Sequence, residues 1–195
     1  MHLVCAGESG AALLHAEEAT GIYRRLAADD PSAFLPEFAT ALNNLGNHRV
    51  TLGDVSGALA SGREAVSIRR VLASQQPAVF RQELATALTN VAAHLNKAGN
   101  PTEGLRAAEE AVALHRETAE RQPASRVALA CSLGTLAQNL ADTGSRKEAL
   151  VPAGRASVSC ADSSTNSAAP TFPIWLSPFR ITASTWGGTN TPKEP

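Results

Sequence analysis

Two histidines and three cysteines are the residues of this chain whose chemistry would be most distinctive. His48 and His94 lie 46 residues apart, and Asn139 takes the same place 45 residues further on. If equivalent helices stack, the two imidazoles could face each other. Zinc needs three or four ligands, however, and the third position offers only an amide. The pair therefore favours a solvated face, and we predict no metal site.

The cysteines do not form a recognisable set. Cys5, Cys131 and Cys160 are odd in number, widely separated and outside any CxxC pair. This pattern argues against a disulfide framework or a zinc knuckle and favours small packing residues in a reducing compartment. Cys131 has no histidine in its local sequence, so a nucleophile with an adjacent base is not indicated. We predict no cofactor and no enzyme activity.

The other titratable residues repeat with the chain. Glu17-Glu18 and Glu109-Glu110 resemble paired carboxylates, and Arg24-Arg25 and Arg69-Arg70 form a basic counterpart. Because each pair falls at an equivalent place, we interpret them as exposed faces, with the arginines pairing with nearby acids. His15 and His115 are interpreted as ordinary surface polarity.

A period of about 46 residues organises the chain. Pro31, Pro77 and Pro123 are 46 residues apart, and Gly7, Gly53, Gly99 and Gly144 are spaced by 46, 46 and 45. Within each unit, apolar residues recur at i, i+3, i+4 and i+7, a helical stripe. In the first unit Arg49 is the misfit, and we expect its stem to follow the apolar face with its head in water.

Each unit is predicted to be a pair of helices. A glycine in the left-handed conformation ends the first helix. The second helix has a face of small residues, such as Ala58, Gly62 and Ala65, and finishes at the proline. Such a pair cannot bury its own apolar face alone, so stacked units are expected to form an all-α solenoid.

These residues resemble the tetratricopeptide repeat, in its kinesin-light-chain-type or long bacterial tandem variant. A Leu-Gly or similar pair is followed by a small residue twelve positions on and another seven later, as in Leu45-Gly46, Ala58 and Ala65. The period exceeds the family's usual ~34 residues, and we expect the excess to lengthen the second helix. The resemblance implies a scaffold that binds a peptide or partner helix in a groove lined by first helices. Carried over by position, the groove residues would be Thr40, Asn43, Asn47, Thr51, Thr86, Thr89, Asn96, Lys97, Gln138 and Asp142.

The pattern sets the expected domain bounds. Residues 1–160 form the helical domain, with a partial repeat at 1–31, repeats at 32–77 and 78–123, and a degenerate repeat at 124–160. Pro152 falls inside the last second helix, where a proline costs about 3 kcal/mol. Residues 161–195 are rich in Ser, Thr, Pro and Gly and are predicted to be a disordered tail. Gly7 aligns with Gly53, so we expect the chain to start inside a first helix. The second helix of the partial repeat at 1–31 would then be partly uncovered and available for homo-oligomerisation.

The composition limits the classes of molecule that this chain is expected to bind. The formal net charge is −1, which argues against nucleic acid or an anionic membrane surface. No run approaches the ~18 apolar residues of a membrane span, and no secretory signal is visible, so a cytoplasmic location is expected. We predict a protein-interaction scaffold. The alternative is a regulatory fragment of a larger signalling protein or enzyme whose catalytic part lies elsewhere.

Overall fold

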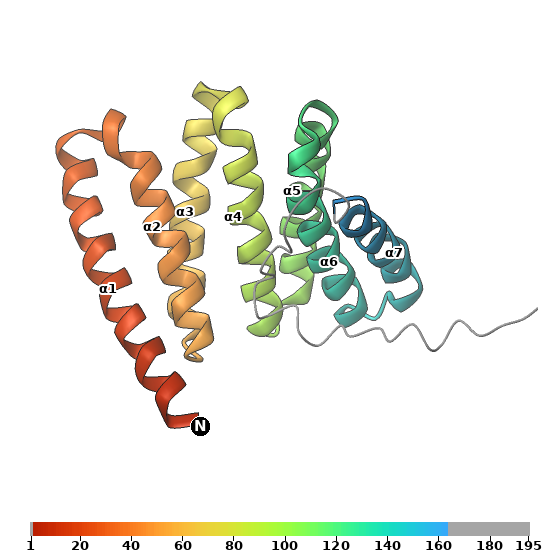
Figure 1. Ribbon diagram of the computed structural model, residues 1–195, viewed down its shortest axis with the longest axis horizontal. Helices are drawn as coiled ribbons and strands as arrows, with labels where there is room; N and C mark the ends of the chain where they lie inside the picture. The colour runs from red at the N-terminus through yellow and green to blue at the C-terminus, as the bar shows by residue number, and fades with distance from the viewer. Residues whose placement is uncertain (1, 164–195) are drawn as a thin grey trace, which may run out of the picture.

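The computed structural model describes residues 2–163, and seven α-helices account for nearly all of them. Figure 1 shows the helices side by side in chain order, with α1 at one end and α7 at the other. No strand occurs within this range, so the predicted all-α solenoid is confirmed. The helices are α1 (His2–Asp29), α2 (Pro31–Thr51), α3 (Val55–Gln75), α4 (Pro77–Lys97), α5 (Pro101–Arg121), α6 (Arg126–Asp142) and α7 (Arg146–Ser163).

The prolines start the first helices of the repeats. Only Asp30 separates α1 from α2, and only Gln76 separates α3 from α4, so that Pro31 and Pro77 occupy the first helical position. Proline suits this position because its fixed φ is helical and its missing N–H would have no partner there. Pro123 instead opens a 3₁₀ turn, η1 (Pro123–Ser125), before α6. Each repeat therefore begins one residue earlier than the predicted 32 and 78.

The predicted glycine turns are confirmed. Gly53, Gly99 and Gly144 have φ of 86°, 77° and 90°, the left-handed region that glycine enters without steric cost. In each turn the N–H after the glycine donates to a carbonyl five residues back, at 2.9 Å in all three cases. This closure joins each first helix to its antiparallel second helix.

The small residues bring helix backbones close together, as predicted. Ala58, Ala65, Ala108 and Ala111 are fully buried. A methyl group added to Gly46 on α2 would lie 3.2 Å from the Ala58 carbonyl oxygen on α3. In the next repeat the glycine lies on the second helix and the alanine on the first. A methyl on Gly104 of α5 would lie 3.0 Å from the carbonyl oxygen of Ala92 on α4.

Three predicted helix boundaries are wrong. The extra length of the repeat was expected in the second helix, but the first and second helices share it. α2, α3, α4 and α5 each have 21 residues. α1 is one continuous helix that passes through Gly7 without a turn. α7 passes through Pro152 and reaches Ser163, beyond the predicted boundary at 160. A proline removes one backbone hydrogen bond from the helix, and the buried packing of Ala149 and Pro152 holds α7 in place. The predicted tail lies outside the described residues from 164 onward.

Two arginines lie differently from the prediction. The Arg49 head is only partly in water, because the side chain is 25% exposed and its guanidinium donates to Glu17 of α1 at 3.1 Å and to Ser61 of α3 at 3.2 Å. It therefore ties three helices together. Arg69 is not part of an exposed strip, because it is only 8% exposed and reaches Thr40 of α2.

The remaining prediction for the arginines, pairing with acids, is confirmed between successive second helices. Arg24 pairs with Glu64 at 3.1 Å and Arg70 pairs with Glu110 at 2.6 Å, in equivalent places one repeat apart. All four side chains are more than 40% exposed, so each pair stabilises the stack by about 1 kcal/mol at most.

Candidate partner-binding surface

The first helices form one polar surface, here called the first-helix surface: the sides of α2, α4 and α6 that face away from α3, α5 and α7. α2 packs against α4, and α4 packs against α6. Amide side chains bridge the neighbours: Asn90 donates to Asn43 at 2.9 Å, and Asn96 donates to Asp142 at 2.7 Å. Residues 46 or 47 apart in sequence are therefore in direct contact.

The structure leaves nine of the ten predicted groove residues at least partly accessible. The exposed ones are Thr40, Thr51, Thr86, Lys97 and Asp142, and the half-buried ones are Asn43, Asn47, Asn96 and Gln138. Thr89 is the exception, because it is 4% exposed and its hydroxyl donates to the Ala85 carbonyl of its own helix. A position in the middle of the α4 packing face cannot contact a partner, so its inclusion was wrong.

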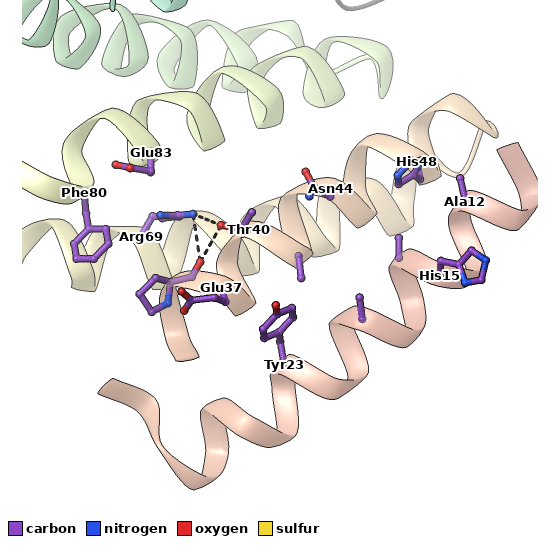
Figure 2. Close-up of a pocket in the computed structure, with 14 residues that line it drawn as sticks. Ala12, His15, Tyr23, Glu37, Thr40, Asn44, His48, Arg69, Phe80 and Glu83 are labelled. Atoms are coloured by element: carbon purple, nitrogen blue, oxygen red, sulfur yellow. Dashed lines mark hydrogen bonds between the residues drawn. The ribbon is translucent and has the colours of Figure 1, made fainter. Parts of the chain in front are cut away.

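A groove of about 760 Å³ opens between α1, α2 and the start of α4. Figure 2 shows the side chains that line it. Of the ten predicted residues, only Thr40 is among them. The polar or aromatic side chains that sequence reasoning missed here are His15, Tyr23, Glu37, Asn44, His48, Arg69, Phe80 and Glu83.

One signal for this groove was present in the sequence. Glu37 and Glu83 are 46 residues apart and occupy the same place in successive repeats. The contribution of α1 could not be seen in the same way, because α1 has no preceding first helix in the described chain and itself forms the groove wall with Ala12, Ala16 and Tyr23.

Arg69 crosses from α3 into the floor of the groove. Its guanidinium donates to the Thr40 hydroxyl at 2.6 Å and to the Pro36 carbonyl at 3.4 Å. Burial lowers the pKa of the Arg69 guanidinium below its ordinary value, and the charges of Glu83 and Glu37 oppose that shift. In Figure 2 the two carboxylates lie on either side of the guanidinium. The three charges form one electrostatic unit at this end of the groove.

Glu83 has unused hydrogen-bonding capacity. One of its carboxylate oxygens, Oε2, is buried and accepts no hydrogen bond from the described residues. The Nη2 group of Arg69 donates to Thr40 and Pro36 instead. A buried carboxylate oxygen without a donor costs free energy that a suitable partner recovers.

The histidines do not make a common site. His48 lines the groove, whereas His94 is 4% exposed and packs where a methyl on Gly46 would lie 3.5 Å from its ring. Burial lowers the pKa of His94 to about 4, and the charge of Lys97 adds to the effect. Within residues 2–163, no three His, Cys, Asp or Glu side chains gather in a way that could hold a metal ion.

His115 was wrongly assigned to the surface. It is 1% exposed, and its Nδ1 lies 2.5 Å from the Ser132 hydroxyl of α6. Burial lowers its pKa to about 4, partly offset by the Gln82 backbone of α4. The Ser132 hydroxyl also lies 2.8 Å from the Ala128 carbonyl oxygen of its own helix. His115 therefore joins α4, α5 and α6 as a structural residue.

Comparison with known proteins identifies the repeat. Residues 84–123, from α4 through α5 to Pro123, match the Tetratricopeptide repeat family. The match identifies one tetratricopeptide repeat in the chain, and the 46-residue period and the stacked antiparallel helix pairs extend the same arrangement along the described residues.

The solved structures that are similar to the chain include the following two, and no curated protein matches it. The crystal structure of MamA protein is 14% identical, with 86% of this chain and 82% of that chain covered and a TM-score of 0.47. The crystal structure of BtubC (BKLC) from P. vanneervenii is 13% identical, with 83% and 94% covered and a TM-score of 0.29. Among the described helices, none has the length and apolarity that crossing a bilayer demands.

Proposed function

We propose that this chain is a protein-interaction scaffold that binds a peptide or partner helix along the first-helix surface, with the groove beside α1 as its principal site. The observation that carries the proposal is the groove itself. Its volume of about 760 Å³ falls in the range of ~300–1,000 Å³ in which proteins hold ligands. It also combines aromatic walls with polar groups that can fix a peptide's orientation.

The rest of the proposal follows from the same features. The first-helix surface continues from the groove across α4 and α6 and offers the exposed or half-buried side chains of Asn47, Lys97 and Gln138. A bound segment could therefore extend over more than one repeat. We propose a cytoplasmic location on the sequence grounds above, and no catalytic role, because the sequence provides no nucleophile with an orienting base.

A phage-displayed library of random dodecapeptides, panned on the immobilised full-length chain, tests the proposal. We expect selected peptides to bind with Kd values in the micromolar range. Asn44→Arg places a bulky side chain in the groove, since Asn44 is exposed and lines it. This variant should lose binding. Gln75→Arg, an exposed position at the end of α3 outside the groove lining, is the matched control.

A second variant locates the remaining contacts. Changing Asn43, Asn47 and Asn96 together to Ala removes polar groups from the first-helix surface beyond the groove, and we expect a weaker effect than Asn44→Arg. Failure to select any peptide would overturn the proposed function. Peptides that bind Asn44→Arg as tightly as the unmodified chain would move the site away from the groove.

A further inference from the structure

We propose that the groove beside α1 selects a basic side chain, lysine or arginine, in the peptide that it binds. The inference rests on the proposed function and adds the chemistry of the partner. Its basis is the way the charged groups at one end of the groove are paired with one another and with their neighbours.

Carboxylates outnumber available cations at this end of the groove. Glu37 and Glu83 both line it, and Arg69 is the guanidinium between them. Arg69 is 8% exposed and directs its hydrogen bonds to Thr40 and Pro36. Its positive charge therefore compensates part of the negative charge of Glu37 and Glu83, but it donates no hydrogen bond to Glu83.

Glu83 then lacks a donor on its buried side. Its Oε2 atom accepts no hydrogen bond from the residues that the structure describes. An ammonium or guanidinium group brought by a peptide would supply that donor and charge together. Such charge-assisted hydrogen bonds are about twice as strong as neutral ones.

The walls suit the rest of a basic side chain. Phe80 of α4 lies at the same end of the groove as Arg69 and Glu83, and Tyr23 of α1 faces α2 near Glu37 (Figure 2). Aromatic faces attract cations and cover the aliphatic stems of lysine and arginine. His15 and His48 lie toward the other end of the groove, away from Glu83.

An acidic peptide group fits this place poorly. To reach the guanidinium of Arg69, it would have to approach the two carboxylates of Glu37 and Glu83 on either side. The like charges would oppose its entry.

Peptides selected on the full-length chain supply the probes for the test. For the tightest selected dodecapeptide we expect at least one lysine or arginine whose replacement by methionine weakens binding about 10- to 100-fold. Glu83→Gln should weaken the parent peptide by a similar factor. It should leave the methionine peptide nearly unchanged, because the two substitutions remove the same interaction. Glu109→Gln, at an exposed position of α5 outside the groove lining, is the control and should have no effect.

The outcomes separate this inference from the proposed function. If peptides bind and Asn44→Arg abolishes binding, but no basic residue is required and Glu83→Gln changes nothing, the scaffold stands and the basic selectivity is wrong. If acidic peptides are selected and Glu83→Gln strengthens them, the selectivity is also wrong. If no peptide is selected, the scaffold proposal itself fails.

Discussion

The burial of two neutral histidines predicts that this solenoid loses stability in mild acid. The pKa values of His94 and His115 are lowered from 6.5 to about 4 in the folded chain. Between those values the unfolded chain takes up a proton at each position and the folded chain does not. Stability therefore falls as the pH falls through this window and is fully retained above it.

The magnitude follows from the size of the shifts. Each pH unit within the window changes the free energy of unfolding by about 1.4 kcal/mol per histidine. From about pH 7.5 to about pH 5, each histidine accounts for a loss of about 2 kcal/mol, and the two together for about 4 kcal/mol. That is a large share of the ~5–15 kcal/mol typical of folded domains.

The sequence of the third repeat suggests a substitution that tests whether His94 causes the loss of stability in acid. Asn139 occupies in the third repeat the place of His94 in the second; it is fully buried and donates to the Thr135 carbonyl at 2.9 Å. His94→Asn should therefore fold, and should lower the pH-dependent loss by about half, whatever its effect on stability at neutral pH. Urea unfolding followed by circular dichroism at both pH values measures the difference.

Two controls isolate the histidine effect. His15→Asn removes an imidazole from an exposed position of α1 and should keep the full loss. The helix-capping carboxylates titrate below the window, because hydrogen bonds from Ser32 and Gly57 lower the pKa values of Asp30 and Asp54 from 3.8. An equal loss in the unmodified chain and in His94→Asn would refute the argument that buried neutral imidazoles cause it.

The remaining predictions concern helix packing, the C-terminal segment and assembly. Gly104→Ala should destabilise by about 1–3 kcal/mol in urea unfolding, because the new methyl would meet Asn139 and the Ala92 carbonyl; Gly21→Ala, with nothing within 4 Å of the added methyl, should stabilise by up to ~1 kcal/mol. Arg49→Met should cost about 1–2 kcal/mol, because it removes the hydrogen bonds to Glu17 and Ser61; an unchanged urea midpoint would contradict this. Deleting residues 164–195 should leave helicity and melting temperature unchanged by circular dichroism, since that segment has no helical apolar period. Light scattering at tens of micromolar should show association, because Leu14 and Ile22 of α1 are 67% and 43% exposed; a monomer that persists at that concentration would contradict it.

Most of the fold was predictable because its determinants repeat. The left-handed turns at Gly53, Gly99 and Gly144 and the buried face of Ala58 and Ala65 depend on residue type and spacing alone. What depends on contacts between repeats was not predictable in the same way. Arg69 and Arg70 are neighbours in sequence, yet one is buried against α2 and the other pairs with Glu110 on the exposed side. Their difference comes from the rotation of about 100° between successive helical residues.

The candidate site also has features that the repeat pattern predicts and features that depend on contacts between repeats. The prediction used positions that line first helices in this family, and in the structure Asn90 contacts Asn43 and Asn96 contacts Asp142 between neighbouring first helices. It could not find the groove, because the groove depends on α1, a second helix whose side chains fill the place next to α2. Its charge depends in turn on Arg69, which comes from α3 and forms its hydrogen bonds below the surface. Side chains of α1, α2 and α3 thus line the groove together with Glu83 of α4. In this chain the repeat predicts the scaffold, whereas contacts between helices of different repeats determine the surroundings of Glu83.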